Sequence, residues 1–327
     1  MNELLPWQAG VWARLTEREN QPHAYLLHGP QGIGKRGLAE QFMAYLLCRT
    51  PYNQQACGQC RSCQLLAAGS HPDHWVMQAE AEDKAIRVDQ VRELVSFVAQ
   101  TAQLGGRKVV LIEPAEAMNL NAANALLKSL EEPAGDTVLL LLSHAPSRLL
   151  ATLRSRCVQQ ACPVPTRREG LTWLTAQMPE IDAAQLNAVW ALSGGLPLRA
   201  RILLEQGALA HHDHAIEGLK QILKQQVTAS QLAEQWKSIP LILVLEWLFY
   251  WSQAVLKRQL GAPVEVAPEM EKVVEYLAER AQPQTVAQLQ NDVIKRRDQL
   301  LAKANLNPQL LLEALLIQWA ALRSRQH

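Results

Sequence analysis

The sequence has almost no net charge and lacks any long hydrophobic run. Lysine and arginine number 32 and aspartate and glutamate 31, so the formal net charge is +1. This balance excludes a global basic field for nucleic acid, and any such contact must come from a local patch. The longest apolar stretch, residues 241–251, contains Glu246 and is too short to span a bilayer. We therefore interpret it as a buried helix.

The N-terminus also lacks the features of an export signal. Residues 1–10, MNELLPWQAG, have no charged start, apolar core and small-residue cleavage site in sequence. Four of the six cysteines lie between positions 48 and 63. In a chain without an export signal, such a cluster indicates metal before disulfide. We expect a cytoplasmic protein with no membrane partner.

The first half of the chain alternates apolar runs with helical patterns. The 327 residues, 48% of them hydrophobic, are enough for two or three domains. Short apolar runs predict buried parallel strands at residues 24–28, 108–113 and 137–143. Three/four spacing predicts helices from Val88 to Val98 and over 121–132, the second stopped by Pro133. We therefore predict an α/β domain with a parallel sheet and flanking helices over residues 1–163.

The rest of the chain predicts helices only. We expect a small helical domain over residues 164–207 and an all-α domain over 208–327, with a loop at 261–268. Prolines mark the expected turns: Pro240, Pro283 and Pro308. Residues 310–319 are apolar around most of the helix, as in helices buried in a bundle or at a subunit interface.

A run of histidines in this second part resembles a metal site only superficially. His211, His212 and His214 are neighbours in sequence. Adjacent positions on a helix point in different directions, so we expect these side chains to form a solvated surface.

The stretch GPQGIGKR, residues 29–36, has the pattern of a phosphate-binding loop between a strand and a helix. The glycines let backbone N–H groups close around phosphate oxygens, and the helix N-terminus and the lysine add positive charge. The candidate nucleotide-binding residues are Gly29, Gly32, Gly34 and Lys35. The next position should carry a hydroxyl that ligates Mg²⁺, but Arg36 has no lone pair for a cation.

The acidic site of a nucleotide hydrolase is altered as well. The 108–113 strand ends in Glu113-Pro114, where such an enzyme needs Asp-Glu to hold the metal and activate water. Loss of a catalytic acid or base alone slows such chemistry by about 10²–10⁴-fold. We predict that the chain does not use ATP and Mg²⁺ for hydrolysis by itself. Binding without hydrolysis stays open, as does a loop that binds nothing, with Lys35 and Arg36 solvated.

The cysteine cluster has the spacing of a closed metal site. Two residues between cysteines let consecutive sulfurs face one tetrahedral ion at about 2.3 Å, and Gly58 allows a tight turn. The candidate ligands are Cys48, Cys57, Cys60 and Cys63. Four thiolates leave no open position, so zinc would be structural. The alternative is a set of reduced, unligated thiols. Cys157 and Cys162 receive no metal role.

An arginine follows the last predicted strand, in Ser155-Arg156-Cys157. An arginine at a domain edge can reach a neighbour's γ-phosphate and stabilise the charge that develops there, worth about 10³–10⁵ in rate. The tripeptide alone proves nothing, because an unrelated surface arginine would look identical.

Two stretches together resemble a known family. NALLKSLEEP at 124–133, followed by a strand and then LRSRC at 153–157, resembles the clamp-loader subunits of bacterial DNA polymerase III. The resemblance covers the layout of the whole chain and is specific from about 24 to 157. It implies an AAA+ α/β module with a small zinc knuckle, a helical lid domain and a helical collar domain that joins a five-subunit loader. The degenerate phosphate loop and intact Ser-Arg-Cys resemble a member that is not an ATPase.

The resemblance also implies roles and partners. By it, the four cysteines named above bind zinc, and Arg156 is an arginine finger that acts in trans on ATP held by a motor subunit. The implied partners are motor and delta-type subunits, the sliding clamp and, through the complex, primer–template DNA. Motor subunits sense nucleotide with a Gly-x-x-Arg motif, whereas this chain has Pro197 there, with Arg199 two positions on.

We therefore expect a non-hydrolysing stator that helps load the clamp during replication. One alternative is an autonomous AAA+ ATPase, suggested by the loop glycines and Lys35. The other is a zinc-dependent DNA-binding module, for which four arginines could touch a phosphate backbone: Arg148, Arg154, Arg167 and Arg168.

Overall fold

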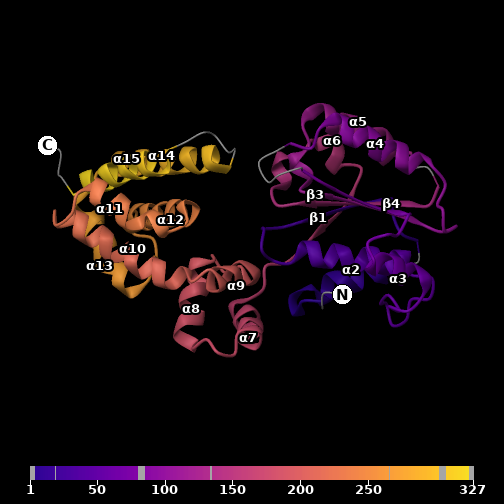
Figure 1. The fold of residues 1–327 in the computed structure, drawn as a ribbon, viewed down its shortest axis with the longest axis horizontal. Helices are drawn as coiled ribbons and strands as arrows, with labels where there is room; N and C mark the ends of the chain where they lie inside the picture. Colours follow the sequence, from indigo (N-terminus) through magenta and orange to yellow (C-terminus); the bar gives the residue numbers. More distant parts are fainter. Residues whose placement is uncertain are drawn as a thin grey trace. The chain divides into compact units, whose positions relative to one another are not determined.

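The computed structural model describes residues 4–18, 20–79, 85–132, 135–264, 266–301 and 307–323 (Figure 1). Contacts within the chain divide it into two units. The first comprises Met1–Gln177 with Gly195–Arg199, and the second comprises Met178–Gly194 with Ala200–His327.

A five-stranded sheet forms the centre of the first unit, and its strands pair in parallel in the order β2-β3-β4-β1-β5. The strands are β1 (Ala24–His28), β2 (His74–Gln78), β3 (Lys108–Glu113), β4 (Thr137–Ser143) and β5 (Val158–Ala161). The predicted bounds of β1, β3 and β4 are confirmed. The two edge strands, β2 and β5, were not predicted.

Helices cover both faces of this sheet, as predicted (Figure 1). Leu26 and Leu139 face a core shared with α4 (Val88–Ala99) and α5 (Leu120–Glu131). The next residues along each strand face the opposite core, shared with α1 (Ala9–Thr16) and α2 (Lys35–Leu47). Each fully buried leucine contributes about 1.5–3 kcal/mol, so a strand buried on both faces needs a continuous apolar sequence.

Both helices that the apolar spacing predicts between these strands are confirmed. α5 ends at Glu131, and Pro133, which we predicted to stop it, lies outside the described residues. Shorter elements complete the first unit: η1 (Pro6–Gln8), α3 (Arg61–Ala67), η2 (Ala115–Ala117), η3 (Pro146–Arg148), α6 (Ala151–Arg154) and α7 (Arg167–Gln177).

After β5 the described chain contains helices and no strand, as predicted. The elements are α8 (Ala183–Leu192), α9 (Pro197–Glu205), α10 (Ala208–Leu223), α11 (Ala229–Gln235), η4 (Trp236–Ser238), α12 (Leu241–Gln259), α13 (Pro268–Arg280), α14 (Pro283–Leu301) and α15 (Pro308–Ala321). Pro268, Pro283 and Pro308 are the first residues of their helices, where the missing N–H is not needed.

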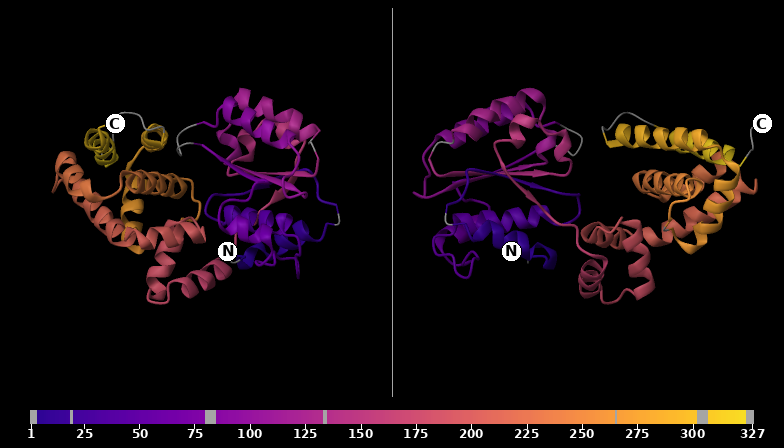
Figure 2. Two further views of the ribbon diagram at one scale, coloured as in Figure 1. Left: turned by 45° about the vertical axis from the view of Figure 1, so that its right-hand side comes forward. Right: turned by 180° about the vertical axis from the view of Figure 1, so that it is seen from behind.

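The core of the second unit is built around α12. This helix packs against α13 and α14, while α11 packs against α15. In Figure 2, α12 lies between α10 and the yellow helices of the same unit. Its buried Trp251 contacts Trp319 of α15. In the part of the chain that the structure describes, no helix has both the length and the apolar composition that a membrane crossing needs.

The prediction of a solvated histidine run is wrong for His212. This side chain is 4% exposed, and its ring packs against Trp247 and Trp251 at centroid distances of 5.2 and 5.4 Å. Its helix, α10, turns this position inward, while His214 lies on the exposed face. The residues do point in different directions, as expected, but one direction is the core.

Candidate functional site

The phosphate-loop residues lie where the sequence predicts, between β1 and α2. Gly34 caps α2 with φ of +87°, a conformation that side chains rarely adopt. The amide of Gly29 donates to the Ser143 carbonyl oxygen of β4. A Cβ at position 29 would lie 2.8 Å from the Cys162 carbonyl oxygen. The loop therefore has the glycine-dependent backbone of a phosphate cradle, held against two neighbouring strands.

The lysine of this loop is turned back onto the loop itself. Lys35 is 3% exposed, and its Nζ donates to the carbonyl oxygens of Gly29 at 2.7 Å and Pro30 at 2.6 Å. Burial lowers the pKa of Lys35 to about 8. The alternative of a solvated Lys35 is therefore wrong, because the backbone carbonyls of the loop accept the hydrogen bonds that a phosphate would otherwise accept.

Arg36 forms ion pairs with two carboxylates, at the place where a nucleotide hydrolase would hold Mg²⁺. Its Nη1 donates to Glu113 Oε2 at 2.6 Å, and its Nε donates to Glu40 Oε1 at 2.5 Å. These two carboxylates come from β3 and from the next turn of α2. The guanidinium therefore stands between the helix and the strand end from which a hydrolase would hold Mg²⁺. The alternative of a solvated Arg36 is also wrong, because the side chain is only partly exposed and pairs with two carboxylates.

Two segments that the sequence reasoning missed lie against the loop. The indole N–H of Trp7 donates to the Ile33 carbonyl at 2.9 Å, and the Gln8 side-chain amide donates to the Gly34 carbonyl at 2.9 Å. The amide of Leu198 donates to the Gly32 carbonyl at 3.2 Å. Trp7 is the one sequence signal that could have drawn attention to the N-terminal segment, since a tryptophan near a chain end is seldom left in water.

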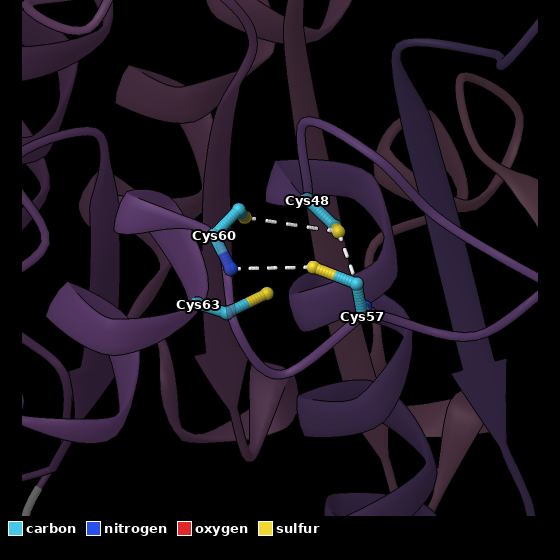
Figure 3. A group of neighbouring side chains, drawn as sticks. All are labelled: Cys48, Cys57, Cys60 and Cys63. Atoms are coloured by element: carbon cyan, nitrogen blue, oxygen red, sulfur yellow. Dashed lines mark hydrogen bonds between the residues drawn. The ribbon is translucent and has the colours of Figure 1, made fainter.

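The four cysteines of the cluster converge, although they come from separate segments. Cys48 follows α2, Cys57 lies in the loop, and Cys60 and Cys63 bracket the start of α3. All four Sγ atoms lie within 4.8 Å of one another and point into a common space (Figure 3). The Sγ atoms of Cys48 and Cys60 are 3.9 Å apart. Tetrahedral zinc with bonds of about 2.3 Å needs sulfurs about 3.8 Å apart, so this donor set fits a Zn²⁺ ion.

Backbone amides donate hydrogen bonds to the cysteine sulfurs, which favours the negatively charged thiolate form. The amide of Cys57 donates to Cys48 Sγ, and the amide of Cys60 donates to Cys57 Sγ, each at 3.3 Å. The Thr50 hydroxyl at 3.4 Å and the backbone amides of Gln59 and Cys60 lower the pKa of Cys57 to about 6. Burial instead raises the pKa of Cys63 to about 12. A bound divalent cation would deprotonate such a thiol. Cys157 and Cys162 are buried away from this group.

Arg156 lies in the turn between α6 and β5 and is held by its own unit. Its Nε donates to Glu131 Oε1 at 2.7 Å, and its Nη1 donates to the Thr152 carbonyl at 2.9 Å. About a third of the side chain remains exposed. Glu131, which the sequence reasoning did not single out, is therefore the ion-pair partner of the candidate finger. Its place in the SLEEP stretch is the signal that could have marked it.

Comparisons with known proteins relate both parts of the chain to one enzyme. Residues 7–163 match the family described as DNA polymerase III, delta subunit, and residues 206–321 match the family described as DNA polymerase III, delta subunit, C terminal. The DNA polymerase III subunit delta′ of Pseudomonas aeruginosa is 55% identical over 324 residues, covering 98% of this chain and 99% of the relative.

A second relative is more distant but also spans most of both chains. Subunit delta′ of Escherichia coli K12 is 35% identical over 303 residues, 90% of this chain and 88% of that protein. Among solved structures, a DNA polymerase III gamma subunit-related protein from Thermotoga maritima aligns with a TM-score of 0.49 and 18% identity, covering 97% of this chain and 99% of that one.

Proposed function

Because the chain belongs to the family of DNA polymerase III delta′ subunits, we propose that it is a non-hydrolysing clamp-loader subunit that lends Arg156 to the ATP site of a neighbouring subunit. In this role it works in the cytoplasm with motor and delta-type subunits to place a sliding clamp on primed DNA. The three-part division at residues 163 and 207 belongs to the same proposal, with the last part as the collar.

The observation that carries the proposal is the ion pair between Arg36 and Glu113. A guanidinium carries no lone pair, and here it occupies the carboxylate that would have to hold the metal. A phosphoryl transfer depends on a cation that bridges the phosphate oxygens. This pair therefore supports a nucleotide site that cannot assemble the metal for hydrolysis, whatever the glycine pattern of the loop.

The second half of the proposal rests on the chemistry of Arg156. A guanidinium that is partly exposed can exchange the Glu131 carboxylate for a phosphate, because both accept the same planar pair of donors. Thr152 holds the side chain through a second bond, so the cation is already partly ordered before any partner arrives. Ordering in advance reduces the entropy that the contact must offset.

The proposal gives a structural role to the cysteine cluster formed by Cys48, Cys57, Cys60 and Cys63. Four thiolates leave no coordination position for a substrate, so we assign it one zinc ion that orders the segment between α2 and α3. Zinc bound there would supply no catalytic chemistry. The protein's own part is to present the sulfurs and to shield them with amides.

The trans role can be tested in an assembled loader. Substitution of Arg156→Ala should lower DNA-stimulated ATP turnover at the facing site by about 10³-fold, since an arginine finger contributes at least that much. Steady-state phosphate release, with assembly verified by intact mass, measures this. The control is Arg92→Ala, which removes an exposed arginine of α4 and should leave turnover unchanged.

Two outcomes would contradict the proposal. Unchanged turnover by the Arg156→Ala assembly would remove the trans role. Phosphate release by the isolated chain, abolished by Lys35→Ala, would support the autonomous ATPase instead.

A further inference from the structure

A chain of buried hydrogen bonds lies next to the cysteine cluster. Ser62, which directly precedes Cys63, is 2% exposed, and its hydroxyl donates to the Leu47 carbonyl at 2.6 Å. Leu47 is the last residue of α2 and directly precedes Cys48. The Nε2 of His71, a 5% exposed residue, lies 2.8 Å from the same hydroxyl oxygen. One serine therefore joins the residues that adjoin two of the four cysteines.

The partners of His71 define the direction of these bonds. The amide of Asp73 donates to His71 Nδ1 at 3.1 Å, so Nδ1 is the acceptor and Nε2 carries the hydrogen. His71 Nε2–H then donates to Ser62, whose own hydrogen goes to Leu47. Every donor in the series has an acceptor, and the imidazole is neutral.

The far end of the series is fixed to the sheet. The Asp73 carboxylate accepts the amides of Gln103 at 2.7 Å and Leu104 at 2.9 Å, just before β3. Asp73 is 1% exposed and its carbonyl accepts the amide of Val109. The hydrogen bonds thus run without interruption from the start of β3 to the end of α2.

We propose that Ser62 and His71, here called the Ser62–His71 bridge, are positioning residues for metal binding by the four cysteines. The inference rests on the zinc site of the proposed function. Cys48 and Cys63 are the buried members of the cluster, at 9% and 7% exposure; Cys48 directly follows α2, and Cys63 lies in α3. The bridge fixes the end of α2 against the start of α3, and it therefore sets the separation of these two sulfurs before any ion arrives.

The other two cysteines do not need such support. Cys57 and Cys60 are positioned by short-range bonds to sulfur within the cluster. Fifteen residues (48 to 62) separate Leu47 from Cys63 along the chain, so the intervening segment does not by itself fix the two helix ends against each other. Removing a polar group that orients a metal ligand changes metal affinity by about 10–100-fold. The bridge orients its two cysteines through the adjoining backbone, so we expect an effect of the same size.

The full-length chain can test this with Zn²⁺ and with Co²⁺ as a spectroscopic substitute. Chelator competition should give Ser62→Ala a zinc dissociation constant about 10–100-fold higher than that of the parent. Ser62→Thr keeps the hydroxyl and should recover most of the parental affinity. His71→Ala should weaken zinc as Ser62→Ala does, and the double variant should lose no more than the larger single loss, because both act through one series of bonds.

The matched control is Ser252→Ala. Ser252 is fully buried in α12, and its hydroxyl also donates to a backbone carbonyl, that of Phe249 at 2.8 Å. This variant loses a comparable hydrogen bond in the other unit, so it should leave zinc affinity unchanged. A general loss of stability would affect both serine variants in thermal unfolding, whereas the Co²⁺–thiolate absorption should change only for Ser62→Ala.

The outcomes separate the two proposals. Zinc affinity of Ser62→Ala within twofold of the parent would overturn the bridge and leave the metal site standing. If the parent itself takes up neither Zn²⁺ nor Co²⁺, the metal site fails first and the bridge fails with it. Should Ser62→Ala not fold, His71→Ala, which retains the Ser62 bond to Leu47, decides the question by the same measurement.

Discussion

At the scale of single residues, the phosphate loop is altered by charges that find partners inside the protein. Arg36 meets Glu40 and Glu113, and Lys35 meets two carbonyls of its own loop. The Arg36 pair is partly exposed, at 34% and 14% for the arginine and Glu113, so it adds little stability of its own. Its consequence in the proposed function is for nucleotide binding, because the pair engages the carboxylate that a hydrolase would need to hold a metal.

His212 is a second residue whose surroundings decide its chemistry. Its ring packs against two tryptophan rings that also contact each other, and burial lowers its pKa to about 4, partly opposed by Glu269. Asp213 Oδ1 is 3.9 Å from Nδ1, but this carboxylate is mostly exposed and does not offset the burial. The neutral imidazole is therefore the form that the second unit stabilises.

This pKa predicts a loss of stability in acid. An unfolded histidine has a pKa near 6.5, so between pH 6.5 and 4 the unfolded chain binds more protons and the free energy of unfolding falls with pH. The histidine should contribute about 2 kcal/mol of loss between pH 7 and pH 5. Urea denaturation followed by tryptophan fluorescence should show this, and His212→Phe should remove it.

The comparison residue for this prediction is His214, on the exposed face of the same helix. His214→Phe should keep the parental dependence on pH. A slope that His212→Phe leaves unchanged would show that other groups carry the acid sensitivity.

At the scale of elements, the position of a strand in the sheet decides whether its own sequence predicts it. β1, β3 and β4 lie inside the sheet with helices on both faces, and their apolar runs predicted them with the observed bounds. β2 and β5 are the edges. β5, with the sequence Val-Gln-Gln-Ala, is half-exposed and has no apolar run. Its strand state comes from pairing with β1, which no local pattern records.

The N-terminal 3-10 helix η1 packs against the phosphate loop. Trp7 packs edge-on against Trp173 of α7 at 5.7 Å while its indole bonds to the loop. A Cβ on Gly34 would lie 2.3 Å from Leu5 Cδ1. The segment from Leu5 to Gln8 therefore rests directly on the turn that would receive phosphate.

Trp7→Phe should accordingly destabilise the first unit. The change keeps an aromatic ring but removes the N–H donated to Ile33, worth about 1 kcal/mol. Denaturation of the isolated chain measures the loss. Trp12→Phe is the control, since Trp12 of α1 is buried mainly by ring contacts with Phe42 and Tyr45. Equal losses in both variants would mean that ring volume, not the hydrogen bond, decides the effect.

At the scale of the whole molecule, the two units should respond differently to metal. The cysteine cluster belongs to the first unit, while the helices from α10 to α15 form a separate tryptophan-rich core. Binding stabilises only the structure that contains the site, by about 4 kcal/mol when free zinc is a thousandfold above its dissociation constant.

Removing zinc with a strong chelator should therefore speed amide exchange in residues 48–67 and leave residues 208–301 unchanged. Hydrogen exchange with mass spectrometry measures both regions in one sample. A variant with Cys57→Ser and Cys60→Ser should show the amide exchange rates of the chelated parent, and adding the chelator should not change them. Faster exchange in both regions would contradict a purely local role.

The sequence by itself determined what depends on near neighbours. Apolar runs defined the central strands, prolines marked turns between helices, and the spacing of Cys57, Cys60 and Cys63 predicted a convergent cluster. In the same way the glycines predicted the loop between β1 and α2. Such features follow from backbone geometry and burial within a few residues, so one stretch of chain contains their cause.

Only the tertiary structure decided which distant groups meet. Arg36 and Glu113 are 77 residues apart, and Trp7 reaches the Ile33 carbonyl across 26. The burial of His212 and the strand state of β5 also depend on partners elsewhere in the chain. A charged or polar side chain takes the nearest acceptor that folding brings to it, and local spacing does not record which one that is.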